Sequence, residues 1–483
     1  MLENLKPERV FYYFEEISKI PRSSWNTGRI AGYLETFAIT HNLAYHRDVY
    51  DNVIIYKRAS EGYEDAAAVI LQGHTDMVTE QEEGWNHNFD EEGIVLCTEG
   101  DFVRAEHTTL GADDGIAVAF ALAILEDDSL PHPSLEVLLT SNEEVGLLGA
   151  EKLDSSLIRG KYLINLDSEE EGFLLCGCAG GLNLESCIPV SFVEEKGTCY
   201  EIRISGLKGG HSGMEIIRPR ANANKLMGRF LFELKEEVPC LLADISGGKK
   251  HNVIASFARA VIVAGDEDEA AIQSMAEKFQ DIIRREYAGE DDEIILQCRK
   301  TDRETVQVLH PVSMEKIVFY LMNQPHGVIK MSGLISDMAE TSANAAVMSL
   351  DEEGFHSLTS IRSSLESAKT ALENQICYLT EFLGGECSKN GDYPAWEYEE
   401  HSPLRDLACR VYQEMFQKPM QTSTIHAGLE CGLLKGKAPS LDCVSFGPDI
   451  FDVHSPKERL SVSSTQRMWS FLLNLLKNMK SMF

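Results

Sequence analysis

Short apolar runs separated by helical stretches mark the first third of the chain. The runs are residues 66–71 (AAAVIL), 135–140 (LEVLLT) and 161–166 (KYLINL), each of a length typical of a parallel strand buried on both faces. Residues 115–126 form a longer apolar stretch, which predicts a buried helix. This β-α-β alternation predicts a sheet covered by helices.

The pattern changes in the middle of the chain, where one arrangement of strands and helices occurs twice. Each pass fits a split β-α-β unit with its helices on one face of the sheet. The first pass has strands at 200–207 and 251–263 and helices at 221–234 and 269–287. The second has strands at 293–299, 342–350 and 356–364 and helices at 313–323 and 367–383.

The last part of the chain again combines helix and strand patterns, with an amphipathic helix at 403–416 and a short strand at 442–446. We therefore predict an α/β protein in which one α/β domain is discontinuous, formed by residues 1–187 and 396–483. An α+β domain of two ferredoxin-like repeats, residues 188–395, is inserted between its halves. Domain insertions of this kind are tolerated at surface loops.

Composition narrows the possible partners and the compartment. The 44 basic and 77 acidic residues give a formal charge of −33, which a nucleic acid backbone would repel. No stretch approaches the ~20 apolar residues of a membrane span, and residues 1–22 mix charges throughout, so we expect a cytoplasmic protein without a membrane segment. The 12 cysteines are scattered, which indicates reduced thiols. Cys176 and Cys178 could be redox-active or metal-binding, although plain structural thiols explain them more simply.

Acidic and imidazole side chains recur where the apolar strands end. In open α/β sheets the crevice beyond the carboxyl ends of the strands is the ligand site. Two further aspartates, Asp113 and Asp114, directly precede the long apolar helix. The strand-end residues are His74, Asp76, Glu143, Glu144, Asp167 and His454.

Each of these residues also has a simpler explanation. A histidine at a strand end is ordinarily a solvated loop residue, and Asp114 before a helix is an ordinary N-cap. Glu143 and Glu144 could form a solvated turn. Together, however, so many carboxylates at one sheet edge would repel one another and shift their pKa values. A pair of divalent metal ions would remove that repulsion.

Histidine and carboxylate ligands without thiolate are typical of zinc, manganese or cobalt in hydrolytic sites. Two metals ~3.5–4 Å apart need one bridging carboxylate and about two further ligands each. Five candidates fit that count, with Asp113 as the bridge. Glu143 is then left over as a general base, and Asp76 is placed to hydrogen-bond the imidazole of His74. The five candidate ligands are His74, Asp113, Glu144, Asp167 and His454.

Six motifs occur in the order GHTDMV, LGADDGIAVA, TSNEEVGLLGA, NLDSEE, HAGLECG and VHSPKE. With the opening LKPERVFYYFEEISKIPRSSWNT, they resemble the aminoacyl-histidine dipeptidases, also called Xaa-His or cytosol non-specific dipeptidases. These belong to the di-metal aminoacylase, carboxypeptidase and dipeptidase superfamily. The resemblance implies a di-metal catalytic domain in which His74 and Asp167 hold one metal, Glu144 and His454 hold the other, and Asp113 bridges them. It also implies that Glu143 is the base, that Asp76 orients His74, and that the Asp113–Asp114 peptide is cis.

The inserted domain resembles the lid of that family. By this resemblance His211, in SGLKGGHSG, would reach over the metals and stabilise the tetrahedral oxyanion. Arg362 could bind the substrate carboxylate and Asn252 could polarise the same end, while Glu430 could bind the free amine. Taken alone, these residues are typical of solvated turns and surfaces. His426, near Glu430, could equally be structural.

The sequence therefore predicts a cytoplasmic dipeptidase that contains two divalent metal ions, zinc in the first place and cobalt or manganese otherwise. It would hydrolyse dipeptides with free termini, of the Xaa-His type and with broad specificity, by a metal-activated water. A deacylase of N-acyl amino acids or a carboxypeptidase is the alternative enzyme, but the doubled insertion favours the dipeptidases. An inactive metal-binding or regulatory protein is the alternative from another class, and the presence of Glu143 argues against it. A homodimer is the favoured assembly.

Overall fold

The computed structural model describes residues 2–301 and 305–481, and the chain divides into two compact units. Unit 1 comprises Met1–Cys178, Trp396–Thr424 and Leu429–Phe483. Unit 2 comprises Ala179–Ala395 and Ile425–Gly428. The sequence-based boundary after residue 187 falls inside strand β9 (Gly180–Ile188), which is hydrogen-bonded into the sheet of unit 2.

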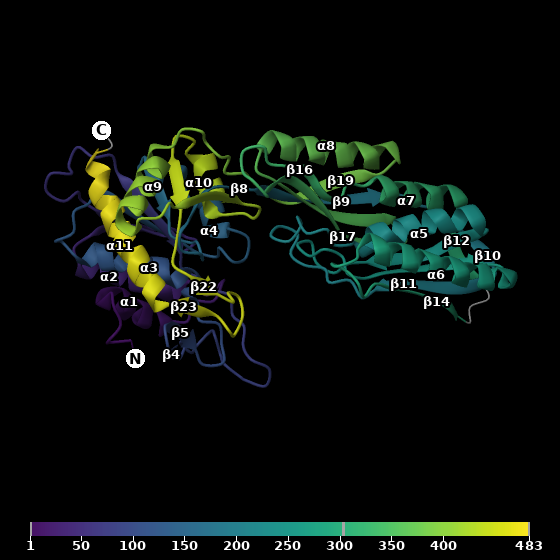
Figure 1. The fold of residues 1–483 in the computed structure, drawn as a ribbon, viewed down its shortest axis with the longest axis horizontal. Coiled ribbons are helices and arrows are strands. Elements are labelled where there is room, and N and C mark those ends of the chain that lie inside the picture. The colour runs from purple at the N-terminus through teal and green to yellow at the C-terminus, as the bar shows by residue number, and fades with distance from the viewer. Residues whose placement is uncertain (1, 302–304, 482–483) are drawn as a thin grey trace. The chain divides into compact units, whose positions relative to one another are not determined.

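Unit 1, drawn in purple, blue and yellow-green in Figure 1, is built on a mixed sheet. This sheet has eight strands in the described part of the chain, in the order β1-β2-β6-β3-β7-β21-β8-β20. Its central strands β6, β3, β7 and β21 are parallel. A smaller sheet has the order β22-β23-β5-β4. The strands are β1 (Ala44–Arg47), β2 (Val53–Lys57), β3 (Val69–His74), β4 (Leu96–Glu99), β5 (Phe102–Ala105), β6 (Leu135–Thr140), β7 (Tyr162–Asn165), β8 (Phe173–Cys178), β20 (Gln421–Ile425), β21 (Asp442–Ser445), β22 (Ile450–Phe451) and β23 (Arg459–Ser461).

Helix α3 (Ala112–Glu126) crosses the core of unit 1. Every residue from Ala112 to Leu125 is buried, which explains why the stretch that follows Asp114 is apolar on all sides. None of the helices within the described residues is long and apolar enough to cross a membrane. The other helices of unit 1 are α1 (Glu8–Ser18), α2 (Gly28–Thr40), α4 (Leu148–Lys152), η1 (Ser155–Leu157), α9 (Pro403–Phe416), α10 (Glu430–Lys437), α11 (Val462–Asn478) and η3 (Met479–Ser481).

The predicted strands of unit 1 occur with small shifts. The run at 135–140 is strand β6, with the same bounds, but the run at 66–71 is realised as β3. Strand β3 begins three residues later than predicted and includes His74 as its last residue. The imidazole is therefore held by the strand itself rather than by the loop after it.

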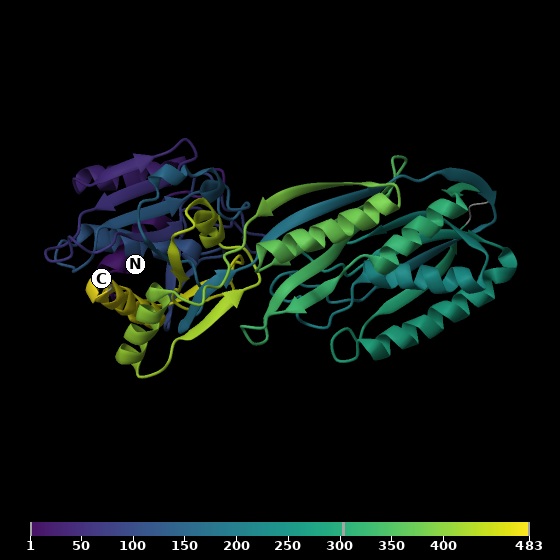
Figure 2. The same cartoon turned by 90° about the horizontal axis from the view of Figure 1, so that it is seen from above.

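Unit 2 contains a separate antiparallel sheet, with nine strands among the described residues, in the order β14-β11-β13-β12-β17-β18-β9-β19 and with β16 paired to β17. Helices α5 to α8 cover one face of this sheet (Figure 2). On the other face, residues of the paired strands β10 and β15 pack with Cys199 and Val261. The helices are α5 (Ala223–Glu237), η2 (Asp266–Asp268), α6 (Glu269–Glu286), α7 (Pro311–Asn323) and α8 (Glu366–Phe382). The remaining strands are β10 (Phe192–Lys196), β11 (Thr198–Ser205), β12 (Cys240–Gly247), β13 (Ala258–Ala264), β14 (Ile295–Thr301), β15 (Thr305–Leu309), β16 (Gly327–Met331), β17 (Ala339–Leu350), β18 (Phe355–Ser363) and β19 (Glu386–Tyr393).

The two sets of elements in unit 2 are nested rather than consecutive. The first set, β11-α5-β12-β13-α6-β14, is continuous along the chain, and β14 pairs with β11. The assignment of residues 293–299 to the second pass is therefore wrong. The second set takes β9 as its first strand, before the first set begins, and continues with α7, β17, β18, α8 and β19. The predicted strand at 251–263 is also shorter, because only β13 is extended there.

The close cysteine pair lies in the core. Cys176 and Cys178 are both buried and neither forms a disulfide. Burial raises the pKa of Cys176 to about 12 and that of Cys178 to about 11. Both are therefore protonated structural thiols at neutral pH, as the simpler interpretation of the sequence has it.

Candidate metal centre and substrate site

The polar side chains that follow the central strands of unit 1 gather at one edge of its sheet. His74 ends β3, Asp167 lies two residues beyond β7, and Glu143 and Glu144 follow β6. Strands β6, β3 and β7 are parallel neighbours, so their carboxyl ends meet at this edge.

Asp113 lies between the two histidines of this cluster. Its Oδ1 is 3.0 Å from Nε2 of His74, and its Oδ2 is 3.1 Å from Nε2 of His454. His454 Nε2 is also 3.1 Å from Oε1 of Glu144, and His74 Nε2 is 3.6 Å from Oδ1 of Asp167. The structure therefore brings all five predicted ligands together. Among the described residues, two groups have ligand atoms close enough to hold a metal ion, namely His74, Asp113 and Glu144, and His74, Asp114 and Asp167.

The electrostatics of the cluster show an excess of buried negative charge. Burial raises the pKa of Asp167 to about 7 and the pKa of Glu143 well above its ordinary value. Burial acts on Asp113 in the same direction, but its hydrogen bonds with His454 and His74 hold its pKa well below the ordinary value. The hydrogen bonds of His454 with Asp113 and Glu144 raise the pKa of His454 to about 11. Nitrogen and oxygen donors with surplus negative charge fit divalent cations.

Glu143 stands beside the predicted ligands without being one of the closest groups. Its Oε2 is 4.0 Å from Nε2 of His74. Its main-chain N–H donates to Oδ1 of Asp76 at 3.0 Å, which fixes the start of the loop after β6.

Asp76 holds several parts of the site at once. It is completely buried, and Nδ1 of His74 lies 3.1 Å from its main-chain oxygen and 3.5 Å from its Oδ1. Its Oδ2 accepts hydrogen bonds from Ser24 Oγ at 2.8 Å and from the Glu144 amide at 3.3 Å. Asp76 thus connects the β3 end with the loop that carries Glu143 and Glu144.

Asp114 does not act as a simple helix cap. Its Oδ2 accepts the main-chain N–H of His74 at 3.2 Å, and its backbone is not helical. The Asp113–Asp114 peptide bond is cis, as the family resemblance predicts.

Two residues that the sequence analysis did not assign shape the loop before Asp113. The buried carboxylate of Glu458 accepts main-chain N–H groups from Leu110, Gly111, Ala112 and Asp113, at 2.8, 2.9, 2.8 and 3.3 Å. Gly111 has φ +67°, and a Cβ there would lie 2.5 Å from Nη2 of the other unassigned residue, Arg22.

Arg22 donates to the carbonyl oxygens of Thr75 and Asp76, at 3.0 and 3.1 Å, and to that of Gly111. Both unassigned residues stand inside motifs quoted for the resemblance, Glu458 in VHSPKE and Arg22 in SKIPRSSW. Their motifs were thus the signal that could have revealed them.

Glu430 is buried beneath the cluster, at the first position of α10. Its Oε2 accepts hydrogen bonds from Gln72 Nε2 at 2.5 Å and Thr140 Oγ1 at 2.6 Å. Its Oε1 has no hydrogen-bond partner among the described residues. Burial raises its pKa to about 7.

His211, Asn252 and Arg362 belong to unit 2. The Nδ1 atom of His211 accepts main-chain N–H groups from Gly213 at 3.2 Å and Met214 at 3.1 Å. Burial, helped by the charge of Arg362, lowers the pKa of His211. The ring is therefore neutral, with its proton on Nε2 as a donor.

Arg362 lies on β18, and its Nη1 donates to the hydroxyl of Tyr393 at 3.1 Å. Asn252 lies in the loop before β13, where its carbonyl accepts the Ser212 amide at 2.9 Å. His426 is buried, with Nε2 2.7 Å from Oγ of Ser342, and burial lowers its pKa to about 4. Its Nδ1 is buried without a hydrogen-bond partner among the described residues.

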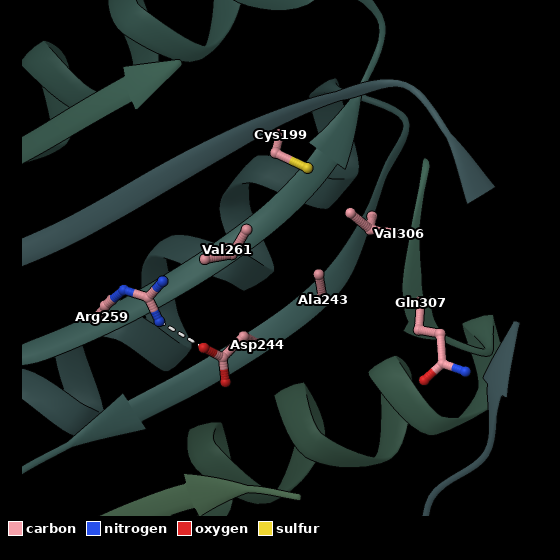
Figure 3. Close-up of a pocket in the computed structure, with 7 residues that line it drawn as sticks. All are labelled: Cys199, Ala243, Asp244, Arg259, Val261, Val306 and Gln307. Carbon is pink, nitrogen blue, oxygen red and sulfur yellow. Dashed lines mark hydrogen bonds and ion pairs between the residues drawn. The ribbon is translucent and has the colours of Figure 1, made fainter. Parts of the chain in front are cut away.

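A cavity of about 490 Å³ lies elsewhere in unit 2 (Figure 3). Its apolar wall includes Cys199, Val261 and Val306. Its charged groups neutralise each other, because Arg259 Nη1 is 2.5 Å from Oδ2 of Asp244. None of the predicted site residues lines it.

A mixed α/β sheet with histidines and carboxylates gathered at its carboxyl edge fits the class of metal-dependent hydrolases. The chain belongs to the peptidase family M20/M25/M40, whose model matches residues 70–478. It is 35% identical to the cytosol non-specific dipeptidase of Escherichia coli (strain K12), over 99% of this chain and 98% of the relative.

Solved structures extend this comparison. The crystal structure of aminoacylhistidine dipeptidase from Vibrio alginolyticus has a TM-score of 0.91 and 32% identity, and the match covers 99% of this chain and 98% of that one. A tripeptidase from Staphylococcus aureus shares the fold, with a TM-score of 0.56 at 13% identity and 99% of each chain covered. The family resemblance predicted from the motifs is thereby confirmed.

Proposed function

We propose that the protein is a metal-dependent dipeptidase that hydrolyses dipeptides with free amino and carboxyl termini, of the Xaa-His type and with broad specificity. The observation that carries the metal dependence is Asp113, whose two carboxylate oxygens lie 3.0 and 3.1 Å from two different imidazoles. The substrate class follows from the relatives named cytosol non-specific dipeptidase and aminoacylhistidine dipeptidase. The first of these names also supports a place in the cytosol.

Two divalent metal ions would be held by five ligands. His74 and Asp167 would bind one ion, Glu144 and His454 the other, and Asp113 both. Zinc suits this donor set best, and cobalt or manganese suit it as well. When bound, the ions would act as Lewis acids toward the peptide carbonyl and the attacking water. Asp76, 3.5 Å from His74 Nδ1, would orient that imidazole.

The other residues would move protons and support charge. Glu143 would take the proton of the attacking water and deliver it to the leaving amine, because it lies next to the ligands and burial raises its pKa. His211 would donate its Nε2 proton to the developing oxyanion, because its Nδ1 is occupied by two amide donors.

Both ends of the dipeptide would be recognised by charge. Arg362 and Asn252 would bind the carboxylate, and Glu430 would bind the free amine through Oε1, the oxygen that has no partner among the described residues. Unit 2 would be a lid of two ferredoxin-like repeats, an assignment supported by the strand orders β14-β11-β13-β12 and β17-β18-β9-β19. Unit 1 would be the catalytic domain, and the assembly a homodimer.

A substrate screen with and without a metal chelator tests this function. Free dipeptides, Ala-His among them, are compared with N-acetyl amino acids and C-terminally blocked peptides. We expect chelator-sensitive release of amino acids from the free dipeptides alone. Turnover of N-acetyl amino acids in preference to free dipeptides would instead identify a deacylase, and metal binding without any turnover would identify a non-catalytic protein.

A further inference from the structure

Trp25 lies on a loop whose successive residues form hydrogen bonds with residues around the candidate metal centre. Ser23 forms a parallel bridge with Met77, and Ser24 Oγ donates to Asp76 Oδ2 at 2.8 Å. The main-chain N–H of Trp25 donates to Oδ1 of Asn142 at 2.6 Å. Asn142 directly precedes Glu143, the proposed general base. The backbone of Trp25 is therefore fixed to the residue that directly precedes the proposed general base.

The backbone conformation at Trp25 is unfavourable for a large side chain. The amide of Asn26 donates to the carbonyl of Ser23 at 2.9 Å, so Ser23–Asn26 is a turn with Trp25 at its third position. Trp25 has φ +68° there, a conformation that glycine adopts without steric cost and that bulky residues rarely adopt. The fold alone would be served better by glycine at this position.

The indole ring gains little from the fold in return. The residue is 72% exposed, although tryptophan is among the side chains that benefit most from burial. Within the described residues its ring takes part in no aromatic stacking and no cation–π contact. Trp85 offers a contrast, because it is 47% exposed and stacks on His107 with ring centroids 4.2 Å apart. An exposed, unstacked ring on a strained backbone, in a loop that is hydrogen-bonded to segments of the candidate metal centre, points to a ligand.

We propose that Trp25 forms one wall of the substrate site and selects dipeptides that carry a planar ring, such as the imidazole of histidine. This inference rests on the proposed dipeptidase function and adds a specificity-determining residue to it. The face of the indole offers a π surface on which an imidazole or aromatic ring stacks, and an imidazolium adds a cation–π attraction. An aliphatic side chain gains less from such a wall.

The test compares the parent enzyme, loaded with zinc, with three variants. Trp25→Gly removes the ring and suits the backbone, Trp25→Phe keeps a ring, and Trp85→Ala removes an exposed indole elsewhere in unit 1. The measured quantity is the ratio of kcat/KM between a ring-bearing dipeptide and Ala-Ala, with Ala-His and His-Ala as the ring-bearing substrates. Zinc content and Tm are measured for every variant.

We expect Trp25→Gly to lower this ratio about 2- to 12-fold, the range of an aromatic pair, for at least one of the two ring positions. Trp25→Phe should retain most of the ratio, and Trp85→Ala should leave it unchanged. The Tm of Trp25→Gly should hold or rise, because glycine relieves the backbone.

An unchanged ratio for both Ala-His and His-Ala in Trp25→Gly would overturn the inference while the dipeptidase function stands. A lowered Tm with equal loss on every substrate would do the same, since it would make Trp25 structural. A parent enzyme that cleaves no dipeptide would refute the proposed function itself.

Discussion

Replacing Glu458 by glutamine tests how the loop before Asp113 is held. The carboxylate accepts four main-chain N–H groups in the present structure. Glutamine is neutral and keeps one acceptor oxygen, so two of these amides retain a weaker, uncharged acceptor, and the other two lose their acceptor and face an NH₂ group instead. At ~1.5–3 kcal/mol for each charged hydrogen bond, the gross loss is ~3–6 kcal/mol.

Part of this loss is offset. Burial raises the pKa of Glu458, which shows that burying its charge costs free energy, and a neutral glutamine avoids that cost. We therefore expect Glu458→Gln to lower the free energy of unfolding of unit 1 by ~3 kcal/mol, the lower end of that range. Because the same loop carries Asp113, zinc affinity should fall by about 10- to 100-fold, as for other residues that position metal ligands.

The chain offers a convenient signal for this measurement. Its four tryptophans, Trp25, Trp85, Trp396 and Trp469, all belong to unit 1, so tryptophan fluorescence during urea unfolding reports on that unit. Zinc affinity is obtained by competition with a chelator. The matched control is Glu151→Gln, which neutralises an exposed carboxylate paired with Lys152 and should change stability by less than ~0.5 kcal/mol. A Glu458→Gln variant with parental stability and parental zinc affinity would refute the structural reasoning.

Three further predictions concern the proposed catalytic groups. Glu143→Gln should keep its metal content and lose about 10²- to 10⁴-fold in kcat, and loss of metal by this variant would mean that base and ligand are interchanged. His211→Ala should depress kcat far more than metal binding, and near-normal turnover would remove this side chain from the reaction. Arg362→Ala should raise KM for dipeptides and narrow their advantage over C-terminally amidated analogues. A parent enzyme with equal kcat/KM for dipeptides and tripeptides would contradict recognition of both termini.

The clustering of the five candidate ligands could be predicted from the sequence because the signal was local, and their role as metal ligands stays a prediction. His74, Glu144 and Asp167 each follow an apolar run, and parallel strands bring their ends together whatever the details of the loops. The strand boundary near His74 was displaced by three residues, since an apolar run does not reveal which of its residues begin the hydrogen-bonded ladder. This shift left the site unaffected.

The residues that were not predicted, Glu458 and Arg22, bind main-chain groups that lie far from them in the sequence. Glu458 is separated from the amides it binds by 345 to 348 positions, and its partners are main-chain groups without any sequence signature. Arg22 likewise acts on carbonyl oxygens. In unit 2 the strand β14 was assigned to the wrong set, because only its pairing with β11 shows to which set it belongs. Pairing between distant strands is a property of the folded sheet rather than of either segment.

The ribbon of β10 and β15 marks the place where one module is inserted into another. Lys196 at the end of β10 is paired with Thr305 at the start of β15, and all of β11 to β14 lies between them. A complete β-α-β-β-α-β set is thus inserted in the chain between the two paired strands of the ribbon. Beyond helix packing, that set joins its neighbour through a short ladder of β12 and β17, Ser246 with Ser349 and Gly247 with Met348. A hairpin turn in place of the set would close the same ribbon without a new crossover, so the insertion of the set at this point leaves the order of the other strands, β17-β18-β9-β19, unchanged.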